Sequence, residues 1–300
     1  MKGDFTFMKK RIYAACALLL VFAMIFSFAA CDAGAAEETE ETTVQAKTEM
    51  PTDKAAIVNY YNSLINAVKV KKPAVKKSQS NENISGVVCG TEDGERNTLL
   101  EKSVPTLKKF ILSGTKSAFE KSRNAETKYG EDLTQIFPVA GQSWSSMLSV
   151  DDVATAECTA NEDNSERTLT ITLKSNQPVG SDETGVIDEA IVKKAFNLGS
   201  VDDRNAAVKE FRDKLSGYIS FTDIESLTYT ECTIVCVIDT KDDVVKSVEY
   251  TRNEKITTTI TGEGTLQEIG TIPCSFIYTY GEKYEMDWVD PSVTTTNEAD

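Results

Sequence analysis

The 300-residue sequence contains no histidine. This absence excludes serine and cysteine hydrolases that rely on a histidine base, and it excludes zinc sites built on imidazole ligands. It also removes the side chain whose charge ordinarily changes near neutral pH. No catalytic residue is assigned from the sequence, and neither a metal site nor a cofactor is expected.

Basic residues are outnumbered, with 32 Lys and Arg against 47 Asp and Glu and a net charge of −15. A nucleic-acid partner is therefore excluded, because binding to phosphates requires clustered basic residues. Acidic residues are so abundant that a pair such as Asp151 and Asp152 is weak evidence for a glycosidase-type hydrolase. Apolar content is ordinary, so the chain has enough apolar residues for a real core.

Charge is also absent from Ile12 to Ala30, and this stretch predicts an export signal. Lys9 to Arg11 precede it, and Cys31 follows two small residues. A basic end, an apolar middle and small residues before the cut are typical of a bacterial signal peptide. The cysteine after the small pair indicates a lipoprotein signal over residues 1–30, with a diacylglyceryl anchor on Cys31.

Plain secretion and an uncleaved helix are the alternatives, since about 20 apolar residues suffice to span a bilayer. Met8 is an alternative start. In every case basic residues precede the apolar run and stay cytoplasmic. The expected location is therefore the cell membrane, with the rest of the chain on its extracytoplasmic face.

The chain after the signal divides into a linker, a domain and a tail. Residues 31–51 carry the anchor cysteine and five glutamates among Ala and Thr, which predicts a disordered acidic linker. Residues 52–290 are expected to form a single α+β domain, with a helical part over 52–145 and a sheet part over 146–290. Residues 291–300 are expected to be a disordered tail.

Helical spacing of apolar residues is clear in residues 52–70, where Ile57, Tyr61, Ile65 and Val68 fall on one face. Further helices are expected in four other segments, and residues 130–150 are expected to be irregular. Those segments are 99–111, 115–128, 185–197 and 203–217.

Alternating apolar residues predict strands in the second half of the chain. We expect a hairpin of 153–160 and 167–175, then a strand from Cys232 to Ile238. A long strand from Val244 to Ile260 with a bulge near Asn253 follows, and a last strand spans 272–280. One face of these strands is apolar and the other is rich in threonine. The expected fold is an antiparallel curved β-meander with helices packed on one face.

Apart from Cys16 in the signal and Cys31 at its end, five cysteines remain: Cys89, Cys158, Cys232, Cys236 and Cys274. An odd number cannot pair completely within an exported chain. On one strand, Cys232 and Cys236 would share a face about 13 Å apart, beyond disulfide reach. We interpret the five as small buried residues, with a bridge among Cys89, Cys158 and Cys274 as the alternative.

A cluster of lysines is unusual in so acidic a chain. It consists of Lys69, Lys71, Lys72, Lys76 and Lys77. One interpretation is contact with anionic lipid or wall polymer near the anchor. The other is a solvated helix end and loop, since lysine is favoured at helix C-termini.

The export signal with Cys31, the acidic linker, the helix pairs and the curved meander together resemble uncharacterised cell-surface lipoproteins of Gram-positive bacteria. The strand–turn–strand pattern from Tyr229 to Tyr250 resembles LolA/LppX-type lipoprotein carriers, over about residues 145–290. In that class a bent sheet closes over helices around a cavity for acyl chains. The resemblance implies that such a cavity is lined by Leu169, Ile171, Ile234, Ile238, Phe276 and Tyr278. The alternative is that these side chains simply pack against the helices.

The sequence thus predicts a non-catalytic, membrane-anchored binding or carrier module for a hydrophobic or amphiphilic ligand, such as a lipid. The alternative is a structural or interaction lipoprotein of the envelope. It would bind a protein or an anionic wall polymer through a sheet edge or the lysine cluster. The oligomeric state is left open.

Overall fold

The computed structural model describes residues 49–90, 96–98, 101, 124–176, 190–198, 213, 215–221 and 225–293. The chain divides into two units, residues 1–46 and residues 47–300. The expected signal peptide, Cys31, most of the linker and residues 294–300 of the tail lie outside the described residues. Within the described ranges, no helix combines the length and the apolar character needed to span a bilayer.

The helix expected over 52–70 is present as α2 (Lys54–Lys71). The Asp53 side chain caps its first turn by accepting a hydrogen bond from the Ala56 N–H at 2.9 Å. Lys72 ends the helix in the left-handed conformation, and its N–H donates to the Val68 carbonyl. The apolar stripe of α2 is buried, with Tyr61 and Ile65 completely inaccessible.

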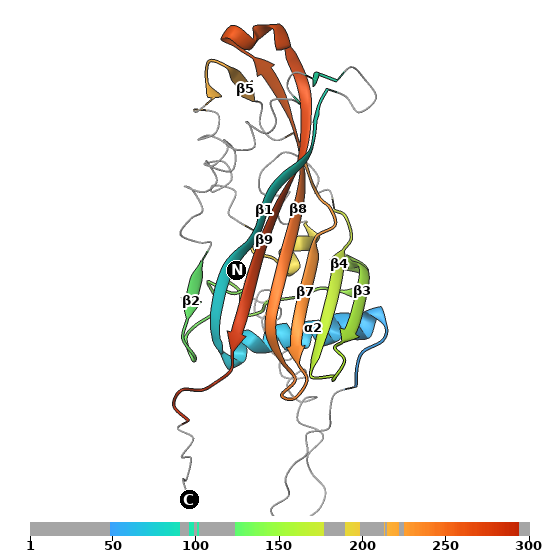
Figure 1. Ribbon diagram of the computed structural model, residues 1–300, viewed down its shortest axis with the longest axis vertical. Coiled ribbons are helices and arrows are strands. Elements are labelled where there is room, and N and C mark those ends of the chain that lie inside the picture. Colours follow the sequence, from blue (N-terminus) through green and yellow to red (C-terminus); the bar gives the residue numbers. More distant parts are fainter. Residues whose placement is uncertain are drawn as a thin grey trace, which may run out of the picture. The chain divides into compact units, whose positions relative to one another are not determined.

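The described strands form one open, antiparallel sheet (Figure 1). Across it the order is β2 (Ala125–Thr127), β1 (Ala74–Cys89), β9 (Thr271–Asp287), β8 (Val244–Gly262), β7 (Thr233–Asp239), β4 (Glu166–Leu173) and β3 (Val153–Ala160). β6 (Ser226–Tyr229) and β5 (Ile219–Phe221) also pair with β8, beyond the part that β7 covers. The predicted antiparallel sheet, its β3–β4 hairpin and its last three strands are therefore confirmed.

β1 was not predicted, and it changes the expected division of the domain. Lys76 and Lys77 lie in this strand instead of a loop, and β1 pairs along its length with β9. A helical part over 52–145 and a sheet part over 146–290 do not exist as such, because β1 and β2 belong to the same sheet as β9.

Three smaller expectations also differ from the structure. β8 pairs with β9 without a shift at Asn253, so the expected bulge is wrong. Residues 125–127, expected to end a helix, form β2. The end of the helix expected over 185–197 is instead the 3₁₀ turn η2 (Ile191–Lys194). The helices expected over 99–111 and 203–217 lie mostly outside the described residues, whereas 130–150 is irregular as expected.

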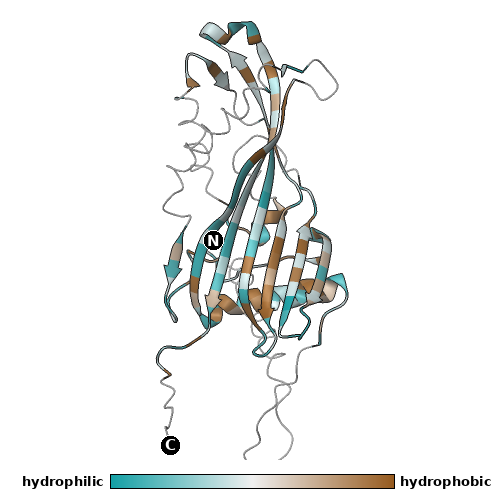
Figure 2. Ribbon diagram, viewed as in Figure 1, coloured by the Kyte–Doolittle hydropathy of each residue, from teal (hydrophilic) through white to brown (hydrophobic). Residues whose placement is uncertain are grey.

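Within the part of the chain that the structure describes, the buried hydrophobic side chains form two clusters. The first cluster joins α2 to the inner face of β4, β7, β8 and β9, and Figure 2 shows hydrophobic residues concentrated on β7 and its neighbours. The second cluster is small and consists of Cys89, Ile219, Ile260 and Cys274. Along β8, Val248 belongs to the first cluster and Ile260 to the second, so the two share one continuous strand.

Candidate functional site

The six side chains predicted to line a cavity divide into two groups. Leu169, Ile171, Ile234 and Ile238 are completely buried and share the first cluster with Ile57 and Tyr61 of α2. Phe276 and Tyr278 are half-buried on β9. The first group therefore packs against the helix, and only the second group reaches the surface.

Between the two clusters, the inner face of the sheet carries charged residues that we call the charged belt: Lys77, Glu82, Arg252, Glu254 and Glu282. The register places them on one face, because Lys77 lies opposite Tyr284, Glu82 opposite Tyr280 and Arg252 opposite Tyr280. Tyr278, Tyr280 and Tyr284 of β9 thus separate β1 charges from β8 charges. The belt is a mixed ionic and aromatic surface.

Ion pairs within the belt are close and mostly shielded from water. Lys77 Nζ lies 2.8 Å from Glu282 Oε1, and Arg252 Nε lies 2.6 Å from Glu254 Oε1. The Tyr284 hydroxyl donates to Glu282 at 2.8 Å, and the Tyr278 hydroxyl donates to Glu82 at 2.9 Å. Lys77–Glu282 and Tyr278–Glu82 join β1 to β9 at diagonal positions. The other two contacts connect residues two positions apart within β8 and within β9.

Aromatic rings complete the belt. The Tyr278 and Tyr280 rings are stacked, with centroids 6.5 Å apart and planes inclined by 18°. The Arg252 guanidinium lies 5.5 Å from the centroid of the Tyr280 ring. Tyr278 and Tyr280 are both half-buried, so this aromatic surface is in part accessible.

Asn197 connects the belt to the irregular segment before β3. Its carbonyl accepts from Arg252 at 2.7 Å, and its side-chain amide donates to the Tyr284 hydroxyl at 2.9 Å. Its side-chain oxygen accepts from the Ala140 N–H at 2.8 Å. One asparagine therefore fixes the position of the 138–144 segment relative to the sheet.

The electrostatics of the belt favour fixed charge states. Burial and the nearby carboxylates raise the pKa of Tyr278 and Tyr284, which keeps both hydroxyls protonated as donors. Burial opposes the charge on Arg252, but Glu254 and its other neighbours outweigh it and raise the pKa of the guanidinium. Groups held this way suit binding better than proton transfer.

The expected lysine cluster is dispersed by the fold. Lys69 and Lys77 are buried, with 6% and 7% exposure, and Lys77 is committed to Glu282. Lys76 is exposed and lies 3.9 Å from Glu126, and Lys71 is exposed beside the Trp288 ring. Lys72 forms the cap of α2. As a five-residue contact for an anionic surface, the prediction is therefore wrong: two members face the interior.

Lys69 instead organises the 138–144 segment. Its ammonium donates to the carbonyls of Pro138, Val139, Gln142 and Trp144 at 2.8–3.0 Å. Val139 has a φ of 59°, which is strained for a β-branched residue. Burial lowers the pKa of Lys69 to about 8, while Asp132 acts in the opposite direction. The ammonium form therefore predominates at neutral pH and holds the four carbonyls.

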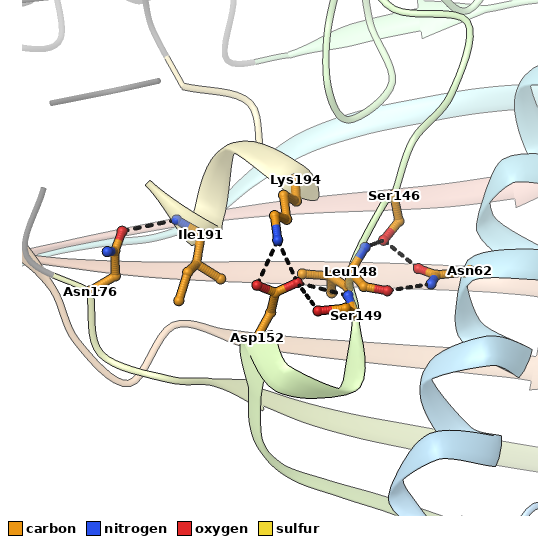
Figure 3. Close-up of polar contacts among 8 residues, drawn as sticks. All are labelled: Asn62, Ser146, Leu148, Ser149, Asp152, Asn176, Ile191 and Lys194. Atoms are coloured by element: carbon orange, nitrogen blue, oxygen red, sulfur yellow. Dashed lines mark hydrogen bonds and ion pairs between the residues drawn. The ribbon is translucent and has the colours of Figure 1, made fainter. Parts of the chain in front are cut away.

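Asp152 is a second buried charge, at the 3₁₀ turn η1 (Val150–Asp152) before β3. Figure 3 shows its carboxylate between Lys194 and Ser149, at 2.7–2.8 Å from the lysine Nζ and 2.7 Å from the serine N and Oγ. Asp151 is exposed. The pair considered for glycosidase chemistry is thus divided, because Asp152 is fully used in tying η2 to η1.

Neighbouring contacts in Figure 3 anchor the same region to α2. Asn62 donates to the Leu148 carbonyl at 2.8 Å and accepts from the Ser146 hydroxyl at 2.6 Å. Asn176 accepts from the Ile191 N–H at 2.9 Å. Two of these contacts satisfy backbone groups, the Leu148 carbonyl and the Ile191 N–H, and the third satisfies the Ser146 hydroxyl, so their role is structural.

Asp152→Asn is expected to lower the free energy of unfolding at neutral pH by about 1–3 kcal/mol. Burial opposes ionisation, but the Lys194 ion pair and the Ser149 hydrogen bonds hold the pKa of Asp152 below its usual value. Its stabilisation is therefore full above the unfolded pKa of about 3.9 and is lost as pH falls through the folded value.

Urea denaturation between pH 3 and pH 7 measures this effect, with the exposed Asp151→Asn as the control. The gap between wild type and Asp152→Asn should close as the solution is acidified. A gap of constant size across this pH range would contradict the assignment of the ion pair.

Sequence reasoning missed the charged belt. Its members are spread over residues 77–282, and a pattern of polar residues alone does not distinguish an inward from an outward face. The available signal was that Tyr278, Tyr280, Glu282 and Tyr284 occupy alternate positions of one expected strand and its continuation, which places a carboxylate on the same face as three tyrosines.

Comparisons with known proteins give no relative for this chain. No family model matches it, and neither a curated protein nor a solved structure is significantly similar to it. The site must therefore be interpreted from its own geometry.

Proposed function

We propose that this protein is a non-catalytic binding protein, anchored through Cys31 on the extracytoplasmic face of the cell membrane, and that it takes an amphiphilic ligand on the inner face of β8 and β9. The observation that carries the proposal is the half-buried stripe of Phe276, Tyr278 and Tyr280 beside Arg252 and Glu254. The location rests on the layout of the N-terminal sequence.

The two parts of this surface suit the two parts of an amphiphile. Phe276 lies opposite Ile256 in the register, and both are half-buried, which provides apolar contact for a hydrocarbon portion. Next along the strands, the stacked tyrosines and the charged belt provide donors and acceptors for a headgroup. Leu169, Ile171, Ile234 and Ile238 are not part of this proposal, because they pack with α2.

The first test is native mass spectrometry on residues 32–300, purified without detergent and followed by lipid extraction. A reproducible bound amphiphile is expected. Phe276→Asn should weaken its binding about tenfold or more, since burying a phenylalanine is worth about 1.5–3 kcal/mol. Tyr218→Asn is the matched control, because Tyr218 is 58% exposed outside this surface.

A ligand-free mass would contradict the proposal if a lipid carrier taken through the same steps kept its lipid. Circular dichroism of Phe276→Asn separates loss of binding from loss of folding. Equal retention of the amphiphile by Phe276→Asn and wild type would move the site away from β9.

A second candidate function, an interaction protein of the envelope, is favoured by the edge strand β3. No described strand pairs with its outer side, and Ala154, Thr155 and Glu157 are exposed. β3 has one charged residue and no proline, so it lacks the usual protection of a sheet edge. Such an edge can accept a strand from a partner protein. A crosslink in intact cells that Thr155→Lys abolishes, without bound amphiphile, would favour this function.

A further inference from the structure

Cys89 and Cys274 face each other directly across the antiparallel pair of β1 and β9. The Gly90 N–H donates to the Pro273 carbonyl at 2.8 Å, which makes Gly90 and Pro273 the hydrogen-bonded pair. Cys89 and Cys274 are therefore the adjacent non-hydrogen-bonded pair, whose Cα atoms lie about 4.5 Å apart. That separation falls within the range of about 4.4–6.8 Å found in disulfides.

The environment of the two thiols agrees with this geometry. Cys89 is 2% and Cys274 is 3% exposed, and both belong to the second cluster with Ile219 and Ile260. A hydrogen bond between their side chains lowers the pKa of Cys89 and raises that of Cys274. The sulfurs are thus in contact, and Cys89 is the better nucleophile of the two.

We propose that Cys89 and Cys274 form a disulfide that joins β1 to β9 at the second cluster. The oxidant is a disulfide, carried by a thiol–disulfide oxidoreductase or a small molecule. The Cys89 thiolate attacks one of its sulfurs and expels a thiolate. Cys274 then loses its proton and attacks Cys89 Sγ, which releases the second thiol. Two electrons and two protons pass to the oxidant, and one S–S bond forms in the protein.

The other described cysteines do not meet the same conditions. Cys158 and Cys236 both lie opposite Leu169 on neighbouring strands, so they are about 10 Å apart. Cys232 and Cys236 are separated by about 13 Å along the chain direction. Burial raises the pKa of Cys232 to about 11 and raises that of Cys158. These three therefore stay reduced, which accounts for the odd number.

The Cys89–Cys274 disulfide would add a covalent link at the smaller of the two hydrophobic clusters among the described residues. Among the residues that the structure describes, the second cluster has four buried members with four partly buried side chains packed against them, and Pro273 in β9 has no N–H for the ladder. A bond between Cys89 and Cys274 closes a loop that includes most of the domain, and long loops gain most from closure in the chain-entropy account. Supply of the oxidant rests on the proposed extracytoplasmic location, whereas the geometry of the pair does not.

The test uses the full chain, refolded with glutathione disulfide, alkylated without reductant and mapped by peptide mass spectrometry. We expect the peptides holding Cys89 and Cys274 to be linked and the link to vanish in Cys89→Ser. Cys158→Ser, the matched control, should keep it. Alkylated Cys89 and Cys274 after refolding, or a link from Cys89 to another cysteine, would overturn the proposal.

A second measurement uses stability. Reduction by a phosphine should lower the melting temperature of the oxidised wild type by about 10 °C and leave Cys89→Ser unchanged. An equal fall in the melting temperatures of wild type and Cys89→Ser would overturn the proposed disulfide. Protein isolated from a cell that exports it separates the disulfide proposal from the proposed extracytoplasmic location. If the disulfide forms on refolding in vitro but Cys89 and Cys274 are free thiols in the isolated protein, the result supports the disulfide geometry and contradicts the location.

Discussion

Lys69→Met is expected to lower the free energy of unfolding by about 3–5 kcal/mol. The substitution preserves most of the side-chain volume but removes the ammonium group and its charge. Four carbonyls, those of Pro138, Val139, Gln142 and Trp144, lose their donor. Because Lys69 is 6% exposed, water cannot replace the ammonium without opening the segment around it.

The measurement is guanidinium denaturation followed by circular dichroism, with Lys71→Met as the control two residues away. Lys71 is exposed, so its replacement should cost less than about 1 kcal/mol. Hydrogen exchange gives a local readout, since the Gln142 N–H bonds to the Val139 carbonyl within the segment and the Gly141 N–H bonds to the Thr134 carbonyl just before it. Unchanged exchange at these N–H groups, or equal losses of stability for Lys69→Met and Lys71→Met, would show that the hydrogen bonds from Lys69 to the four carbonyls do not hold the segment in place.

Arginine at position 69 distinguishes charge from shape. The guanidinium keeps the charge and has more donors, but its planar fork cannot point at four carbonyls that converge on one atom. Lys69→Arg is therefore expected to recover only part of the loss. This partial recovery is the signature of a compact ammonium site.

Local pattern was enough to predict the elements whose buried face is apolar. In β4, Leu169, Ile171 and Leu173 alternate with threonines, and the structure buries each of them. α2 and β7 have equally regular patterns, with periods near 3.6 and 2. For such elements the burial that stabilises the fold is visible in the sequence itself.

β1 escaped prediction because its inner face is charged. Val75, Lys77 and, after a register shift, Glu82 and Ile84 face the same way as Tyr284 and its neighbours on β9. Lys77 and Glu82 read as solvent-exposed in isolation, since their partners Glu282 and Tyr278 are about two hundred residues away in the chain. The burial of a charge depends on such distant partners, and no local window contains them.

The prediction that the five lysines form one contact surface was wrong for a related reason. Proximity in sequence suggested a common surface, but α2 and β1 turn successive lysines in different directions. Lys69 points beneath the 138–144 segment, Lys77 points into the belt, and Lys76 points outward beside Glu126. A charge cluster in sequence becomes a surface patch only where the backbone keeps its members on one side.

Glu282→Gln is expected to cost about 3 kcal/mol of unfolding free energy, the second large effect. It removes the charge that neutralises Lys77 at 2.8 Å and weakens the acceptor of the Tyr284 hydroxyl. Lys77 would then be a buried cation facing an amide. The pair is 8% and 11% exposed, so solvent screens it poorly.

A second lysine–glutamate pair on β9 provides a matched control. Lys283 and Glu285 are also 2.8 Å apart, but they are 39% and 50% exposed. Glu285→Gln should therefore change stability by less than about 0.5 kcal/mol. Urea denaturation of Glu282→Gln and Glu285→Gln compares two Lys–Glu ion pairs with the same N–O distance but different burial. Equal effects would mean that the belt is open to water, and the ion pair would then contribute little.

The double variant Lys77→Met, Glu282→Leu separates the pair's stability from its role in pairing β1 with β9. Removing both charges leaves no uncompensated ion, so the loss should be smaller than for Glu282→Gln alone. The Tyr284 hydroxyl keeps Asn197 as a partner. If the Lys77–Glu282 ion pair also fixes the register of β1 against β9, hydrogen exchange at β1 should be faster in the double variant even where stability recovers. The reason is that apolar side chains tolerate a slipped pairing. Full recovery of both stability and protection would restrict Lys77 and Glu282 to mutual neutralisation.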